Sequence, residues 1–139
     1  MNGTIATEPT GAVTGGLRTL LRLEGLALLG GMTLLYGVWG GPWWMFLVLF
    51  LAPDLSFAAY LGGPRWGAIV YNAAHSTLAP IALMAAGFAL AAPPLQSLAA
   101  IWLAHIGFDR SLGYGLKYPA GFGFTHLGRI GKDAKTGPV

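Results

Sequence analysis

Residues 43–61 read WWMFLVLFLAPDLSFAAYL, an apolar run interrupted only by Pro53-Asp54 and Ser56. A helix that crosses a membrane needs about 20 mostly apolar residues. Short connections rich in glycine and proline separate this run from three similar ones. The sequence therefore predicts four transmembrane helices, over residues 17–39, 43–61, 66–92 and 95–116.

The composition agrees with a membrane protein. Of the 139 residues, 55% are hydrophobic and 9% are charged, whereas soluble domains carry about 25% charged residues. The absence of cysteine excludes a disulfide scaffold and a thiolate metal site. The net charge of +3 comes from eight basic and five acidic residues without a dense basic stripe, so we expect no nucleic-acid partner.

The short connections predict an all-α, up-down four-helix bundle, because they join antiparallel neighbours. We divide the chain into a flexible N-terminal tail (1–16), a transmembrane domain (17–116) and a basic, interfacial C-terminal tail (117–139). All eight lysines and arginines fall on one side of this four-span topology. The positive-inside rule makes that side cytoplasmic, with both termini inside.

Three of the five acidic residues, Glu24, Asp54 and Asp109, lie within predicted spans, as do His75 and His105. At 1.5 Å per residue, the acids are roughly 10 Å and the histidines roughly 13–17 Å from the cytoplasmic ends. Ionisable groups in a bilayer usually mark a functional site. The common depth predicts one polar chamber near the cytoplasmic side, with His105 and Asp109 sharing a helix face at i, i+4.

Carboxylates and imidazoles without thiolates form a ligand set for Zn, Mn or Fe. We predict a divalent metal held by Asp54, His75, His105 and Asp109. The predicted catalytic residues are Glu24, Asp54 and Arg110, with the arginine beside a lipid phosphate. Candidates for substrate binding or for supporting the ligands are Tyr71, Asn72, Ser76, Lys117, His126 and Arg129.

Two prolines and the tail complete the predicted site. Pro53 predicts a break in the second span, and Pro80 predicts another in the third. In the aromatic, glycine-rich tail, Phe122 and Phe124 can dip into lipid, and the tail can cover the chamber with His126 as a further ligand or proton carrier. The alternative is an interfacial tail whose His126 has no role.

Structural interpretations of the same residues stay open. Glu24 can pair with Arg22 or extend toward water, and Asp54 can cap a helix. The histidines can be satisfied within the bundle, and Asp109-Arg110 can be an interfacial charge pair.

The leading hypothesis is a metal-dependent hydrolase acting on a lipid or amphiphilic substrate at the cytoplasmic leaflet. The alternatives are a small proton-coupled carrier, a haem or small-molecule-binding protein, and a scaffold whose polar network fixes the helix register. Membrane lipids are the expected partners, and the many glycines allow close packing within one protomer or in a homo-oligomer.

Five motifs together resemble a bacterial four-helix membrane family, domain of unknown function 4260, over about residues 17–131. They are LRLEG (21–25), APDLS (52–56), YNAAH (71–75), HIGFDRSLGYGLKYP (105–119) and THLGRIG (125–131). The resemblance implies a multi-pass protein of the bacterial inner membrane and implies no activity. A weaker likeness to membrane-bound metal-dependent hydrolases rests on the order Pro-Asp, His and His-x3-Asp.

Overall fold

The structure is a computed structural model that describes residues 12–131. It is mostly helical, and the element order gives the bounds: α1 (Gly15–Trp39), α2 (Trp43–Phe50), η1 (Ala52–Gly62), α3 (Pro64–His75), α4 (Leu78–Ala89), α5 (Pro93–Leu112), β1 (Phe124–Thr125) and β2 (Gly128–Arg129). The four predicted helices are confirmed, although the second and third are each divided in two.

Three segments are long and apolar enough to cross a membrane: Gly15–Trp39, Trp43–Gly62 and Pro64–Ala89. Large apolar side chains are exposed along them, as on a surface that meets lipid. The fourth helix, α5, carries the buried polar residues His105 and Asp109. It is also the most buried element, with nine buried residues. The chain is therefore a membrane protein whose polar helix lies at its centre.

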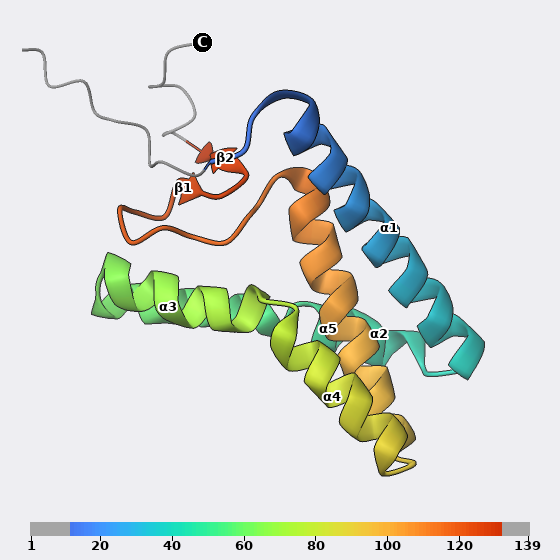
Figure 1. Ribbon diagram of the computed structural model, residues 1–139. Helices are drawn as coiled ribbons and strands as arrows, with labels where there is room; N and C mark the ends of the chain where they lie inside the picture. The colour runs from blue at the N-terminus through green and yellow to red at the C-terminus, as the bar shows by residue number, and fades with distance from the viewer. Residues whose placement is uncertain (1–11, 132–139) are drawn as a thin grey trace, which may run out of the picture.

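Proline explains both divisions, because its ring clashes with the carbonyl of residue i−4 and it donates no hydrogen bond. Pro53 follows the end of α2, and the chain continues as the 3-10 helix η1. Pro80 lies four residues after Ser76, which is extended (φ −78°, ψ 141°) and ends α3. Figure 1 shows α3 lying crosswise to α1, α4 and α5, and η1 packs along α3.

Helix α5 ends at Leu112, four residues before the predicted end. Gly113 has φ 89°, the left-handed conformation that favours glycine. The N–H groups of Gly113 and Tyr114 then donate to the carbonyls of Arg110 (3.0 Å) and Asp109 (2.8 Å). This cap turns the chain back toward the helices.

The described part of the tail packs against the helices. Strands β1 and β2 form an antiparallel pair, and Lys117 bridges to Thr125. Val13 N–H donates to the carbonyl of His126 at 2.9 Å, which joins the start of α1 to the tail (Figure 1). Both ends of the described chain therefore lie at one end of the molecule.

Candidate metal centre

The site begins on α5, where His105 and Asp109 lie one helical turn apart and are 1% and 8% exposed. The ring of Phe50 packs edge-on against the His105 imidazole, with centroids 5.2 Å apart. The burial of both polar groups requires compensating partners. Two such partners come from the divided helices.

His75 is the last residue of α3, so the break at Ser76 places its ring at the centre of the molecule. Its Nδ1 is 2.9 Å from the carbonyl oxygen of Tyr71. With the proton on Nδ1 as donor, Nε2 carries a free lone pair toward the site. The Tyr71 ring stacks on the imidazole at a centroid distance of 3.8 Å and fixes its plane.

Asp54 comes from η1, where the 3-10 geometry of three residues per turn decides which side chains share a face. Asp54 and Phe57, three residues apart, both line the space beside the site. Pro53 and Ser56 line a different pocket on another face of η1. The 3-10 helix η1 therefore places the Asp54 carboxylate and the Phe57 ring on the same face.

Four donor atoms from these elements converge. His75 Nε2 is 3.1 Å from His105 Nε2, 3.5 Å from Asp54 Oδ1 and 3.3 Å from Asp109 Oδ2. His105 Nε2 is 3.4 Å from Asp54 Oδ1 and 3.5 Å from Asp109 Oδ2. The four ligand atoms all lie within 4.8 Å of one another.

These five of the six separations match the spacing of donor atoms around one metal ion. Tetrahedral corners about 2.0 Å from the centre, the usual Zn–N and Zn–O distance, are about 3.3 Å apart. The observed separations run from 3.1 to 3.5 Å. The sixth separation, between the two carboxylate oxygens, is at most 4.8 Å. Asp54, His75, His105 and Asp109 could therefore hold one ion of the predicted set of Zn, Mn and Fe.

A second layer of contacts orients the donors. The Tyr71 hydroxyl donates to Asp109 Oδ2 at 3.3 Å, and the Tyr71 carbonyl faces His75 Nδ1. The indole N–H of Trp102 donates to the carbonyl of Ala74 at 2.6 Å, which ties the last turn of α3 to α5. Contacts of this kind fix ligand geometry in metal sites.

A pocket of about 350 Å³ opens beside the donor cluster. Asp54 and Asp109 contribute carboxylates to it, and Lys117 contributes an ammonium group. Of the four donor side chains, Asp54 is the most accessible, at 37% exposed. The rest of the lining is mostly aromatic and apolar: Phe57, Tyr71, Phe108, Tyr114, Phe122, Ile130 and Gly131.

Asn72 anchors the tail segment that forms one wall of this pocket. Its side-chain amide donates to the Lys117 carbonyl (2.8 Å) and accepts from the Lys117 N–H (2.6 Å). The Lys117 ammonium donates to the Phe122 carbonyl (2.8 Å) and lies 3.6 Å from the centroid of the Phe122 ring. Phe122 in turn packs on Phe57 and Tyr60 of η1. The tail thus covers part of the site.

The ionisation of Lys117 gives a testable pH dependence. Burial lowers the pKa of this ammonium from 10.5 to about 8, against an opposing influence of Asp109. Between these values the unfolded chain binds the proton that the folded chain has lost, so stability rises with pH. We expect the melting temperature of the wild type, relative to Lys117→Met, to increase from pH 8 to pH 10. If this difference in melting temperature stayed constant or fell over the same pH range, the lowered pKa of Lys117 would be contradicted.

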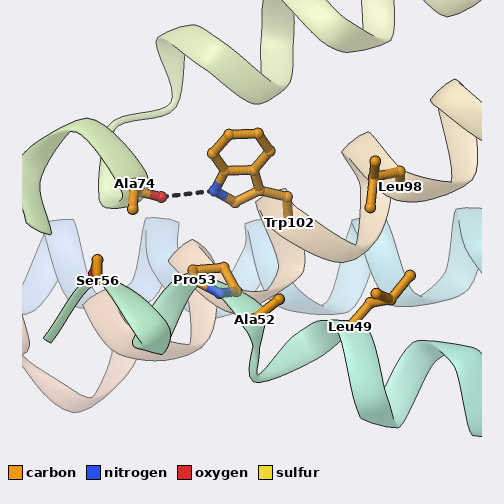
Figure 2. Close-up of a pocket in the computed structure, with 7 residues that line it drawn as sticks. All are labelled: Leu49, Ala52, Pro53, Ser56, Ala74, Leu98 and Trp102. Atoms are coloured by element: carbon orange, nitrogen blue, oxygen red, sulfur yellow. Dashed lines mark hydrogen bonds between the residues drawn. The ribbon is translucent and has the colours of Figure 1, made fainter. Parts of the chain in front are cut away.

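A second, apolar pocket of about 330 Å³ lies on the Pro53–Ser56 side of η1. Figure 2 shows Trp102 above this space, with the hydrogen bond to Ala74 at its edge. The remaining lining residues are also apolar: Leu49, Ala52 and Leu98. Its chemistry suits a hydrocarbon chain.

Other predicted site residues lie outside the donor cluster. Glu24 is exposed on α1 and lines a separate pocket with Arg110 and His126. The prediction that Glu24 shares one polar chamber with the other four ionisable residues is therefore incorrect, because α1 contributes no donor to the cluster. Ser76 Oγ accepts from the Leu78 N–H at 3.2 Å, at the start of α4. The Arg129 guanidinium lies 5.3 Å from the Phe124 ring centroid.

His126 does not have the role of a further ligand that the sequence suggested. His126 Nδ1 accepts from the Leu116 N–H at 2.8 Å, so this imidazole holds the tail turn and is absent from the cluster. Phe122 packs on η1. Sequence reasoning missed Phe57 and Trp102, and the only available signal for Phe57 was its i, i+3 spacing from Asp54.

Fold and site together define a membrane-embedded helical protein with a buried cluster of two imidazoles and two carboxylates. Residues 18–130 match the family described as Domain of unknown function (DUF4260). The chain belongs to this family, as its motifs indicated. Searches of curated proteins and of solved structures found no match.

Proposed function

We propose that the protein is a metal-dependent hydrolase of the bacterial inner membrane that acts on an amphiphilic substrate from the cytoplasmic side. The observation that carries this proposal is the convergence of four donor atoms from η1, α3 and α5 within 4.8 Å of one another, beside a mostly apolar pocket. A bound Zn²⁺ would polarise the scissile group and lower the pKa of a coordinated water toward 7.

Asp54 has the position of a general base. His75, His105 and Asp109 are the three buried donors, whereas Asp54 is more exposed and lines the pocket. Catalytic zinc sites keep three protein ligands and an open position. In our proposal the three buried donors would hold the ion, and Asp54 would accept the proton of a water that attacks an ester or phosphoester and return it to the departing alkoxide.

The pocket lining indicates the substrate class. Its aromatic wall takes an apolar portion, and the Lys117 ammonium stabilises a negative oxygen that develops near the carboxylates. The apolar pocket on the other side of η1 offers room for a hydrocarbon chain. We therefore propose a lipid-like ester or phosphoester.

The alternative functions have less support. Two imidazoles on opposite sides of one haem iron need nitrogen atoms about 4 Å apart, twice a usual metal–nitrogen distance, whereas here the Nε2 atoms are 3.1 Å apart. A proton carrier needs polar groups across the membrane. Neither the connection from α1 to α2 nor that from α4 to α5 contains an ionisable residue.

Asp54→Asn tests the proposed chemistry. With zinc-loaded full-length protein and nitrophenyl esters and phosphodiesters of increasing chain length, we expect hydrolysis to fall at least about 100-fold. The zinc content should persist, because the three buried donors of His75, His105 and Asp109 are untouched. Ser56→Ala, on another face of η1, is the matched control and should keep both the hydrolysis rate and the zinc content of the wild type. Full zinc occupancy without hydrolysis of any of these probes by the wild type would contradict the proposal.

A further inference from the structure

A third pocket lies between α1, α5 and the tail and has a volume of about 250 Å³. It lies outside the metal centre, because it contains none of the four donor residues. Three polar residues, Glu24, Arg110 and His126, line it together with Leu21, Gly25, Leu28 and Leu127. The pocket is thus polar in part and apolar along α1.

The two charges in this pocket are not joined by a direct ion pair. Within residues 12–131, the ion pairs shorter than 4.0 Å all belong to the histidine–aspartate cluster. The Glu24 carboxylate and the Arg110 guanidinium therefore face one cavity while their charges act on each other only at longer range. Such charges are costly in a membrane unless a ligand or water compensates them.

His126 adds a neutral hydrogen-bond donor. Because its Nδ1 accepts from the Leu116 N–H, the ring hydrogen lies on Nε2. Burial and the nearby Arg110 charge lower the pKa of His126, which keeps the ring uncharged at neutral pH. The pocket then offers one fixed cation, one fixed anion and one N–H donor.

We infer that this pocket binds the headgroup of a zwitterionic phospholipid that carries a primary ammonium, that is, a phosphoethanolamine headgroup. Arg110 and His126 hold the phosphate, since a guanidinium fork matches its oxygens. Glu24 holds the ammonium group. Farther along α1, toward the centre of the bilayer, Leu26, Leu34 and Val38 are more than half exposed and offer an apolar surface for the acyl chains.

The pocket size supports a headgroup as the occupant. Its volume of about 250 Å³ is below the roughly 300–1,000 Å³ of pockets that enclose a whole drug-sized ligand. The exposed leucines of α1 continue away from it along a surface that meets lipid. A lipid whose chains stay in the bilayer fits this arrangement better than a soluble molecule that must be enclosed.

Native mass spectrometry of delipidated, full-length protein tests this inference. The probes are dioctanoyl phosphatidylethanolamine, dioctanoyl phosphatidylglycerol and soluble phosphoethanolamine. We expect the wild type to bind the ethanolamine lipid about tenfold more tightly than the glycerol lipid, which lacks the ammonium. Soluble phosphoethanolamine should not compete, because it lacks the chains.

Two variants separate the two charges. Glu24→Gln should remove the preference and leave binding of the glycerol lipid unchanged, whereas Arg110→Gln should weaken both lipids about tenfold or more. Arg65→Gln, which removes an exposed arginine at the start of α3, is the matched control and should behave as wild type. Arg110→Lys should restore part of the binding of both lipids.

Equal binding of the two lipids by the wild type would overturn the inference, as would a loss in Arg65→Gln equal to that in Arg110→Gln. Competition by the soluble compound would show a small-molecule site and would also overturn it. Zinc content and melting temperature of the Glu24 and Arg110 variants report whether the fold and the metal centre survive. The inference does not depend on hydrolysis, so its failure and that of the proposed function are separate results.

Discussion

Full-length protein that carries His105→Ala will lose its metal. The wild type should hold about one zinc ion per chain after reconstitution, and the variant should bind it at least about 100-fold more weakly, since even loss of a supporting contact costs 10–100-fold. The variant removes one of the three buried donors and leaves a cavity where a 1% exposed side chain packs. Elemental analysis and competition with a chelating dye measure the change.

Thermal unfolding gives a second measurement of the same centre. A ligand that binds only the folded state stabilises it by about 2.7 kcal/mol at 100 times its dissociation constant. Chelation should therefore lower the melting temperature of the wild type and leave that of His105→Ala unchanged. An already low melting temperature in the variant does not obscure the result, because the test is the difference that the chelator makes.

His126→Ala is the matched control, because it also removes an imidazole. His126 lies outside the donor cluster and holds the tail by its Nδ1 contact with Leu116. Its loss should loosen the tail and leave the zinc content at about one per chain. The predicted metal centre would be contradicted if both variants lost metal equally. It would also be contradicted if the wild type retained none of zinc, manganese or iron after reconstitution.

Charge gives an independent reason to expect a cation. The two Nε2 atoms are 3.1 Å apart, so they cannot both carry a hydrogen directed at the other. In a hydrogen bond between them one Nε2 is the acceptor and its ring is neutral, so at most one imidazolium is present to balance the carboxylates of Asp54 and Asp109. A divalent cation would balance both carboxylates from the point on which the four donors converge.

The donor cluster could be predicted because each member carries a local signal. His105 and Asp109 share a face by their i, i+4 spacing. Asp54 follows a helix-breaking proline, and His75 precedes another by five residues. Counting residues from the cytoplasmic ends of the helices placed all four at a similar depth in the membrane. The structure brings their donor atoms together.

Depth alone failed for Glu24, because it fixes the level of a residue and leaves its direction around the helix undetermined. Successive residues of an α-helix point about 100° apart. Gly25 is among the α1 residues that pack on α5. Its neighbour Glu24 points to a different pocket, which it lines with Arg110, and away from the donor cluster. Only the pairing of α1 with α5 reveals this direction.

The tail and η1 were harder to predict for different reasons. The three-residue period of η1 replaces the 3.6-residue period assumed for the second span, which changes the partners of Asp54. The tail is held by single contacts over long sequence separations, such as Asn72 with Lys117. A pattern of residue types contains no signal for such a pair.

Gly107→Leu is expected to prevent the native packing of α1 on α5. A Cβ atom at position 107 would lie 2.6 Å from both the Gly25 carbonyl oxygen and the Leu29 amide nitrogen. Both are backbone atoms, so no side-chain rotation relieves the clash. Overpacking usually costs about 1–3 kcal/mol, and we expect more than 3 kcal/mol here because the helices must move apart.

Gly30→Leu is the matched control, since a Cβ there meets nothing within 4 Å. It should yield monodisperse protein with a wild-type melting curve, whereas Gly107→Leu should aggregate or melt far lower. Gly107 lies between His105 and Asp109, so separation of α1 from α5 should also release zinc. A Gly107→Leu protein with wild-type stability and zinc content would show that α5 keeps its position without α1. The expected result would instead show that α1 positions α5. Helix α1 supplies no ligand, whereas α5 supplies His105 and Asp109.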